Sequence, residues 1–389
     1  MYTKRILMAM FFGLLFLSTQ AQVKETEAEV DIHSLGLYNA AQWKILVSYG
    51  KERLAAGIDF PLLRMRVGYA AFMTGNYSLS LTQYKKVYAL EPENNIALYY
   101  VYLNNLYLNN TTEARYYSSL LPDESREQLG IKKNKISNIQ TEFSFKMPDD
   151  TTRKHAQYAR LGFGIQLGYK FELQQSVALF NQVINEPRLL SVINNRRINI
   201  SQKEYYGKLI FAPSGTFSLL GGYHYLYVPF NNIVHNDQIV FAGARYTSPY
   251  IHLKAGVAFG KITDSSYTQF DAAVSVYPLG NTRLYSITRA AYGNDFTLTE
   301  IAGFGISKKV WLEGNITIGK FSNLLENDAL YVYNDIDEKR MKAGGSAYIS
   351  LSKKLLLSLN YTFERKMKFA SNNFYFNQHS INGGLSWTF

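Results

Sequence analysis

Residues 378–389 carry the sequence QHSINGGLSWTF, which alternates between apolar and polar residues. On an extended strand, one face would carry the apolar side chains of Ile381, Leu385, Trp387 and Phe389. The other face would carry the polar side chains of Gln378, Ser380, Asn382, Ser386 and Thr388. Side chains of a strand point alternately to its two faces. This segment therefore predicts a strand with lipid on one side and water on the other, as in a transmembrane β-barrel.

The same strand finishes on aromatic side chains, at Trp387 and Phe389. A terminal strand of this kind resembles the signal by which the outer-membrane barrel assembly machinery recognises its substrates. We therefore expect outer-membrane lipid and this machinery as partners, with Trp387 and Phe389 forming the assembly signal.

The first residues have the pattern of a secretory signal peptide. Lys4 and Arg5 precede an apolar run over residues 6–17, and small residues lead to a cut before Gln22. We expect a signal peptide over residues 1–21, followed by a linker over residues 22–34. The chain has no cysteine, which excludes a lipoprotein anchor, disulfides, thiolate zinc sites and cysteine nucleophiles.

Composition agrees with a barrel. The chain has 31 tyrosines and 24 phenylalanines, and only 18% of its residues are charged. Membrane barrels concentrate aromatic side chains in two girdles at the lipid headgroups. No other stretch is apolar enough to cross a bilayer as a helix, so a barrel is the membrane-spanning structure that remains. The alternative is a large soluble β-protein exported to the periplasm.

Residues 35–130 have a helical period. Trp43, Leu46, Val47 and Leu54 recur at three- and four-residue spacing, as on a helix with one buried face. We predict a helical module here, on the periplasmic side.

A unit of 34 residues, 61–94, lies within this module. Its spacing is marked by Gly68, Gly75-Asn76-Tyr77, Tyr84 and Pro92. This spacing resembles a tetratricopeptide repeat (TPR), in which small residues allow close helix packing and proline ends the second helix. A degenerate second unit runs over residues 95–128, so we expect about two and a half repeats. Their concave face would present Tyr69, Tyr99 and Tyr102 to a periplasmic protein partner.

From Ile136 the period changes to two. Short turn signals fall near residues 169–170, 213–215, 248–249, 279–281, 308–309 and 353–354. Longer polar stretches alternate with them, at 148–155, 184–201, 228–237, 261–266, 293–298, 321–340 and 366–377. Six turns and seven loops predict an antiparallel transmembrane barrel of about 14 strands (12–16) over residues 136–389, in the outer membrane of a Gram-negative bacterium. An alternative within 321–340 is a local hairpin at residues 334–337.

The alternation also predicts which ionisable side chains face the lumen. They are Glu142, Arg160, Lys208, Arg245, Lys254, Asp271, Glu313, Lys342 and Glu364. One interpretation is mutual neutralisation inside a solvated or plugged barrel. The other is a selective conduit for a polar or anionic solute. The formal net charge of +11 would favour anions weakly.

We find no pattern typical of an enzyme. The six histidines are not spaced as metal ligands. Acidic pairs such as Asp149-Asp150, or Asp335 with Asp337, fall in predicted loops, where charges are usually only solvated. We therefore expect no catalytic residue, no metal, no cofactor and no nucleic-acid partner.

The order of signal peptide, short TPR module and barrel resembles the YaiO-like outer-membrane β-barrel family. More distantly, it resembles the TPR-plus-barrel exporters of exopolysaccharides. The motifs that carry the resemblance are those of the 61–94 unit and the terminal residues 385–389. The resemblance implies an integral outer-membrane protein with no catalytic residues to transfer, and it extends to a link with cell-surface polysaccharide as an expectation.

Three hypotheses of function follow. The first is a porin-like channel or exporter for a polar solute or polysaccharide. The second is a non-conducting scaffold that recruits a periplasmic partner through the TPR-like module. The third is an outer-membrane hydrolase, which would need a histidine or acidic cluster at one rim.

Overall fold

The computed structural model describes residues 25–185, 197–230, 233–369 and 374–389. The predicted signal peptide and the first residues of the predicted linker lie outside these ranges. The chain forms two compact units that divide between Thr74 and Gly75. This division falls inside the segment expected to be one helical module, because the later helices cluster with the barrel.

The described part of the first unit, from residue 25 onward, contains three helices. They are α2 (Glu27–Asn39), α3 (Trp43–Ala55) and α4 (Pro61–Met73). Helix α2 occupies much of the segment that we expected to be a linker, so that expectation is wrong from residue 27 onward. The helix begins with a capping box, in which the Thr26 and Glu29 side chains satisfy each other's backbone N–H groups. Val30 of α2 and Leu63 and Val67 of α4 belong to one buried apolar cluster.

The second unit begins with four helices. They are α5 (Tyr77–Leu90), α6 (Asn95–Tyr107), α7 (Thr111–Ser118) and α8 (Asp123–Gln128). Asn76 and Asn94 cap α5 and α6, because each side chain accepts a hydrogen bond from a backbone N–H of the first turn. The stacked rings of Tyr84 and Tyr100, 4.6 Å apart, join the two helices. Among the described residues, no helix is both long and apolar enough to cross a membrane.

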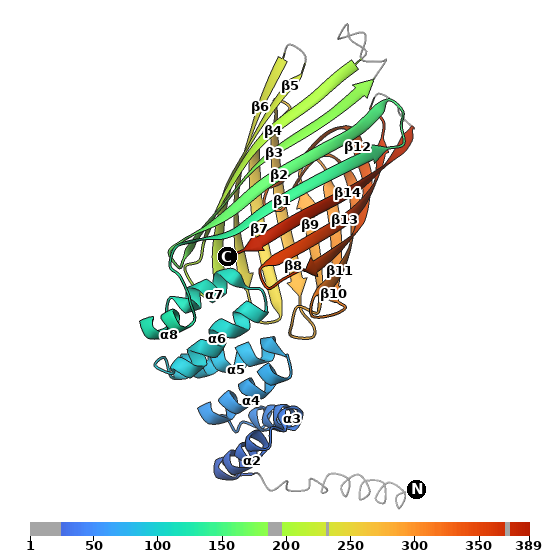
Figure 1. Cartoon of the computed structure of the whole chain (residues 1–389). Coiled ribbons are helices and arrows are strands. Elements are labelled where there is room, and N and C mark those ends of the chain that lie inside the picture. Colours follow the sequence, from blue (N-terminus) through green and yellow to red (C-terminus); the bar gives the residue numbers. More distant parts are fainter. Residues whose placement is uncertain (1–24, 186–196, 231–232, 370–373) are drawn as a thin grey trace, which may run out of the picture. The chain divides into compact units, whose positions relative to one another are not determined.

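Fourteen antiparallel strands follow and close into a barrel, which confirms the predicted architecture and strand number. The strands are β1 (Lys135–Pro148), β2 (Arg153–Leu167), β3 (Phe171–Asn185), β4 (Arg197–Phe211), β5 (Phe217–Phe230), β6 (Ile233–Thr247), β7 (Ile251–Ile262), β8 (Ser265–Val276), β9 (Leu284–Tyr292), β10 (Phe296–Gly305), β11 (Val310–Glu326), β12 (Tyr331–Ser350), β13 (Leu355–Met367) and β14 (Tyr375–Thr388). Each strand pairs with its neighbours in sequence, and β1 pairs with β14 to complete the wall (Figure 1).

The outer surface of the barrel is apolar. On β14, Ile381 and Leu385 are 57% and 43% exposed, whereas Gln378 and Ser380 on the other phase are buried. The same division recurs around the wall. Exposed large apolar side chains on other strands include Phe143, Leu161, Val177, Leu209, Leu219, Val240, Leu253, Phe270, Phe304, Ile316 and Leu359.

The outer surface also carries the carboxylate of Glu300. Glu300 of β10 is directly paired with Ile316 of β11, which points outward, so Glu300 points outward too. It accepts hydrogen bonds from Ser286 Oγ (2.5 Å) and Thr288 Oγ1 (2.6 Å) of β9. These two hydroxyl groups partly compensate a charge that stands among apolar neighbours.

Several stretches predicted to be long loops are strand instead. In residues 228–237, Val228 pairs with His235, and in residues 261–266, Ile262 pairs with Ser265. Backbone hydrogen bonds to a neighbouring strand do not require apolar alternation, so polar composition alone misplaced these strand ends. Most of the stretch 184–201 lies outside the described residues.

The stretch 321–340 differs most from the prediction. Pairing of β11 with β10 ends at Gly319, whereas pairing of β11 with β12 continues to Glu326 and Tyr331. Pairing of β12 with β13 begins only at Glu338. Residues 320–337 therefore leave the wall as a hairpin, which we call the inward hairpin because its contacts lie inside the barrel. It starts at Gly319, whose φ of +134° suits glycine.

Candidate functional site: the barrel lumen

The tip of the inward hairpin is held by charge. The Asp328 carboxylate forms ion pairs with Lys208 of β4, at 3.2 Å, and with Lys254 of β7. Its backbone carbonyl accepts a hydrogen bond from the Tyr206 hydroxyl at 3.0 Å. These partners belong to the inner surface, since Tyr206 is 4% exposed whereas neighbouring Tyr205 is 41% exposed on the outer surface.

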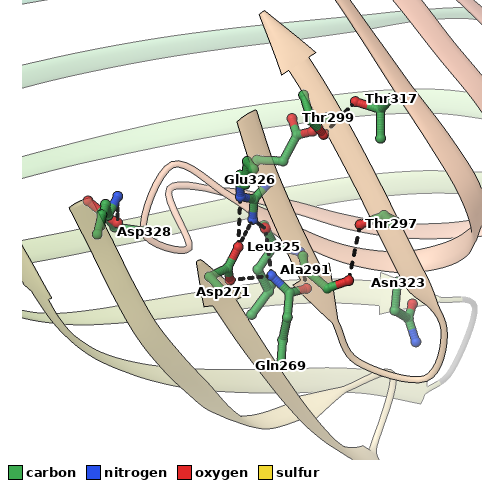
Figure 2. Close-up of polar contacts among 12 residues, drawn as sticks. Gln269, Asp271, Ala291, Thr297, Thr299, Thr317, Asn323, Leu325, Glu326 and Asp328 are labelled. Atoms are coloured by element: carbon green, nitrogen blue, oxygen red, sulfur yellow. Dashed lines mark hydrogen bonds and ion pairs between the residues drawn. The ribbon is translucent and has the colours of Figure 1, made fainter. Parts of the chain in front are cut away.

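The backbone of the hairpin is also bound to the wall. Gln269 of β8 donates to the Leu325 carbonyl (2.8 Å) and accepts from the Leu325 N–H (2.9 Å). Arg289 of β9 donates to the same carbonyl at 2.6 Å and pairs with Asp271 at 2.7 Å. Figure 2 shows Gln269 and Asp271 beside Leu325, with dashed lines joining the hairpin to the strands. Side chains of the wall thus take the place of a neighbouring strand and satisfy the backbone N–H and C=O groups of Leu325.

The hairpin packs against an apolar part of the inner wall. Leu325 and Ala329 belong to a buried cluster whose other members come from β4 to β8. Those members are Ile210, Leu220, Leu226, Val228, Ile239, Phe241, Ala258, Ile262 and Tyr267. Apolar side chains therefore fill this side of the lumen. The signal was present in the sequence, because β5 has apolar residues on both phases, which is typical of a strand buried on both faces.

A polar cavity lies beside the inward hairpin, and its lining also reaches parts of β3 to β6, such as Gln182, Glu204 and Asp237. Its volume is about 690 Å³, and its lining follows β13 from Ser358 to Lys366 and β14 from Gln378 to Ser386. The uncharged polar side chains that line it include Gln140, Ser144, Thr299, Asn315, Thr317, Ser346, Ser358, Asn360, Thr362, Gln378, Ser380, Asn382 and Ser386. The inward phase predicted for the last strand thus lines a space that can hold water and polar solutes.

The structure places all nine predicted lumen residues on the inner side, and eight of them have an oppositely charged partner. The ion pairs are Arg160–Glu142 (3.0 Å), Lys208–Asp328 (3.2 Å), Arg245–Glu113 (3.2 Å), Lys254–Asp328, Asp271–Arg289, Lys342–Glu326 (2.7 Å) and Glu364–Lys366 (3.6 Å). The ninth residue, Glu313, accepts a hydrogen bond from the Tyr285 hydroxyl at 2.8 Å. Sequence reasoning missed most of the partners, because Asp328, Glu326 and Lys366 fell in stretches expected to be loops.

The charges that line the cavity do not favour anions. Six basic side chains line it: Lys146, Arg153, Arg160, Arg289, Lys342 and Lys366. Eight acidic side chains line it: Glu142, Glu204, Asp237, Glu313, Glu326, Asp335, Asp337 and Glu364. The net charge of the lining is therefore −2 with histidine neutral, opposite in sign to that of the whole chain.

The helices of the second unit contact one end of the barrel. Glu113 of α7 accepts from Thr247 Oγ1 (2.8 Å) and pairs with Arg245, and Arg115 pairs with Glu172 of β3. The backbone N–H of Ser78 donates to the Gly280 carbonyl at 2.9 Å. These contacts lie on the β3 to β9 side, which is also the side of the apolar cluster.

Lys85 of α5 is covered by this contact. Its ammonium lies 5.4 Å from the centre of the Tyr117 ring and 3.5 Å from the Gly215 carbonyl oxygen. Burial lowers the pKa of Lys85 to about 8, and the nearby Glu113 opposes the shift.

The candidate partner-binding tyrosines lie on separate units. Tyr69, in the first unit, packs against Tyr38 and Trp43 with ring centres 5.3 Å apart in both cases. Tyr99 and Tyr102 lie on α6 in the second unit, where burial raises the pKa of Tyr102. Their role in binding stays a prediction.

The two aromatic residues of the predicted assembly signal are exposed on the outer surface. Trp387 and Phe389 are 45% and 48% exposed, and their ring centres lie 6.5 Å apart. Their role as a signal also stays a prediction. Within the described ranges, no group of three histidine or carboxylate side chains is placed to hold a metal ion.

Comparisons with known proteins give only distant structural matches. No family model matches the chain, and no curated protein matches its sequence. A FadL homologue from Pseudomonas aeruginosa is 9% identical with a TM-score of 0.45, covering 71% of this chain and 92% of its own. A TodX deltaS2S3 mutant, a monoaromatic hydrocarbon channel, is 9% identical with a TM-score of 0.43, covering 66% and 90%. A bacterial polysaccharide outer membrane secretin is 8% identical with a TM-score of 0.38, covering 65% and 98%. Similarity at this level carries no argument about function.

Proposed function

We propose that this chain is an integral outer-membrane β-barrel whose lumen passes small polar solutes alongside the inward hairpin. Support for the membrane comes from the outer surface, where large apolar side chains stand 40% or more exposed on most strands. Soluble proteins rarely expose apolar patches of this extent. A closed barrel has no unpaired strand edge, so it can sit in lipid with its backbone hydrogen bonds satisfied.

The observation that carries the proposed transport is the polar cavity. It extends along nearly the whole of β13 and β14 and reaches β3 to β6 beside the inward hairpin. The apolar cluster and the contacts of helices α5 and α7 both lie toward β3 to β9. A solute would therefore pass along β1, β13 and β14, where hydroxyl and amide groups can replace its hydration.

The size of the cavity favours a small solute over a polysaccharide chain. A volume of about 690 Å³, spread along the strands, gives a narrow passage. Ligand pockets of comparable volume hold single small molecules. In this proposal the hairpin narrows the lumen. A polymer could pass only if the hairpin lost its contacts with the inner wall.

We place the helices on the periplasmic side. An even number of strands puts both ends of the barrel segment at one end of the cylinder, where helices α5 and α7 contact the wall. In outer-membrane barrels this end faces the periplasm. The TPR-like interpretation of the helices belongs to this proposal.

Reconstitution tests the proposed function. Purified protein in liposomes should permit swelling in solutions of small neutral sugars, at a rate that falls steeply with sugar size. A variant in which residues 321–337 are replaced by a short Gly-Ser linker should pass larger sugars. Absence of swelling with both proteins, each folded as judged by heat-modifiable gel mobility, would refute a transport role.

A non-conducting scaffold is the second candidate. It is favoured by the packed hairpin, which fills the β4 to β8 side of the lumen as a protein core does. In that case the barrel anchors helices that recruit a periplasmic protein. Crosslinking from Tyr99 and Tyr102 would then recover a partner, while wild-type liposomes would stay impermeable and only the variant without the hairpin would swell.

A further inference from the structure

The charged groups along the cavity differ in how well they are compensated. Of the basic side chains that line it, Lys146 alone forms no ion pair among the described residues, and it lies over the Phe180 ring at 5.4 Å. Three lining acids have no lysine or arginine partner within those ranges: Glu204, Asp237 and Glu313. The charge that a passing ion meets along the cavity therefore depends on how exposed these three carboxylates are.

Two of the three carboxylates are enclosed. Asp237 is 1% exposed and accepts the backbone N–H groups of Thr263 (2.8 Å) and Asp264 (3.2 Å). The Glu204 side chain is 7% exposed and lies 3.3 Å from the His224 Nε2 atom. Both side chains are almost fully covered, so a passing solute has little direct contact with them.

Glu313 is held differently. It accepts a hydrogen bond from the Tyr285 hydroxyl at 2.8 Å, lies beside the Tyr348 hydroxyl and is only partly buried, so its partners are neutral tyrosines. The row of directly paired residues continues from Glu313 through Ser346, Asn360, Asn382 and Ser144. All four side chains are uncharged, and all four line the cavity. Glu313 is therefore a negative charge in an otherwise neutral stretch of the passage.

We propose that Glu313 is the specificity-determining residue of the passage and makes it prefer cations and protonated amines to anions. This inference rests on the proposed transport function. It reverses the weak anion preference that the net charge of +11 suggested, because most basic residues near the lumen are neutralised by carboxylates. A unit charge at about 4 Å in water-like surroundings changes the local concentration of an ion about fivefold. We therefore expect a potassium-to-chloride permeability ratio of about 2 to 5.

The test is the reversal potential of the full-length protein in planar bilayers under a tenfold KCl gradient. Glu313→Gln removes the charge and keeps the shape of the side chain, and should bring the permeability ratio to about 1 or below. Glu313→Asp keeps the charge and should retain a ratio above 1. Glu300→Gln is the matched control, because it removes the same charge from the outer surface of the barrel and should leave the wild-type ratio unchanged.

The outcomes separate the two proposals. A chloride preference in the wild type, or a ratio unaffected by Glu313→Gln, would overturn the role of Glu313 while leaving a conducting barrel. An equal shift in Glu300→Gln would show that total charge, and not position, sets the ratio, which also overturns it. Absence of current together with absence of sugar swelling would overturn the transport function, and with it this inference.

Discussion

Replacing Asp328 with alanine should release the inward hairpin. The Asp328 carboxylate is 9% exposed and is shared by two lysines, whose side chains are 14% (Lys208) and 33% (Lys254) exposed. Removing one partner of a buried ion pair costs about 3–5 kcal/mol, because the remaining charge is left uncompensated. Since Lys254 is partly solvated, we use the lower end of this range.

The backbone of the tip adds to the effect. Asn327, Asp328 and Ala329 have φ values of 52°, 62° and 61°, a left-handed conformation that costs roughly 1–2 kcal/mol for each residue other than glycine. The wall contacts hold this strained turn in place. A loss of about 3 kcal/mol would raise the population of the released hairpin about 100-fold, at 1.4 kcal/mol for each factor of ten.

Cysteine labelling measures this population directly, because the chain contains no cysteine. Ala329 is 4% exposed, so Ala329→Cys should react slowly with a water-soluble maleimide in liposomes and much faster when combined with Asp328→Ala. Asp123→Ala, at a helix position where the side chain is 89% exposed, is the control for net charge.

A rescue variant makes the reasoning refutable. Adding Lys208→Met and Lys254→Met to Asp328→Ala removes the uncompensated charges and should restore slow labelling. Unchanged labelling in Asp328→Ala would refute the claim that the Asp328 ion pairs hold the hairpin against the wall. Fast labelling in the rescue variant would also refute it, since the loss would then come from packing or backbone effects.

Three further predictions concern stability, measured as the urea midpoint of the protein in liposomes. The pKa of Lys85 is about 8 in the folded chain against an ordinary value of 10.5, so between these pH values the unfolded chain binds more protons. Stability should rise across this window, by at most about 3 kcal/mol, and Lys85→Met should lose that rise; parallel pH profiles of the two proteins would contradict the assignment. Gly319→Ala should destabilise by about 1–3 kcal/mol, because its φ is +134° and a Cβ would lie 2.5 Å from the Phe296 carbonyl oxygen. Gly314→Ala, where a Cβ would meet no atom within 4 Å, should cost little, and equal losses at the two glycines would disprove the explanation. Glu300→Gln should stabilise by up to about 1 kcal/mol by removing a charge from the apolar outer surface, whereas a lower midpoint would show that the carboxylate is needed there.

Much of the barrel could be predicted because apolar residues at every second position mark the lipid-facing side of each strand. The alternation around Ile381 and Leu385 marks the lipid-facing side wherever it occurs, and turn residues separate the strands. Helix α2 could also have been found, since Thr26 and Glu29 have the spacing of a capping box. Its polar surroundings masked this signal.

The lumen could not be predicted in the same way. A polar segment such as 321–340 has the same composition whether it extends into solvent or folds inward, because the inner wall offers polar partners too. The pairs that hold the helices and the hairpin join distant positions, such as Glu113 with Arg245 and Asp328 with Lys208, for which no local pattern exists. The phase of Glu313 followed from alternation, but its lack of a basic partner depends on where every other charge is placed.

The contacts between the tip of the inward hairpin and the inner wall have a consequence for the order of folding. Its tip is bound by Tyr206, His224 and Gln269, which lie 122, 105 and 56 residues away from their partners in the chain. Contacts between such distant positions form slowly, since the entropy of closing a long loop must be overcome first. The strands that carry these side chains must already be paired into a curved sheet before the tip can bind to them. We therefore expect docking of the tip to be a late kinetic phase, so that a newly inserted cylinder passes through a wider, leakier intermediate before it matures.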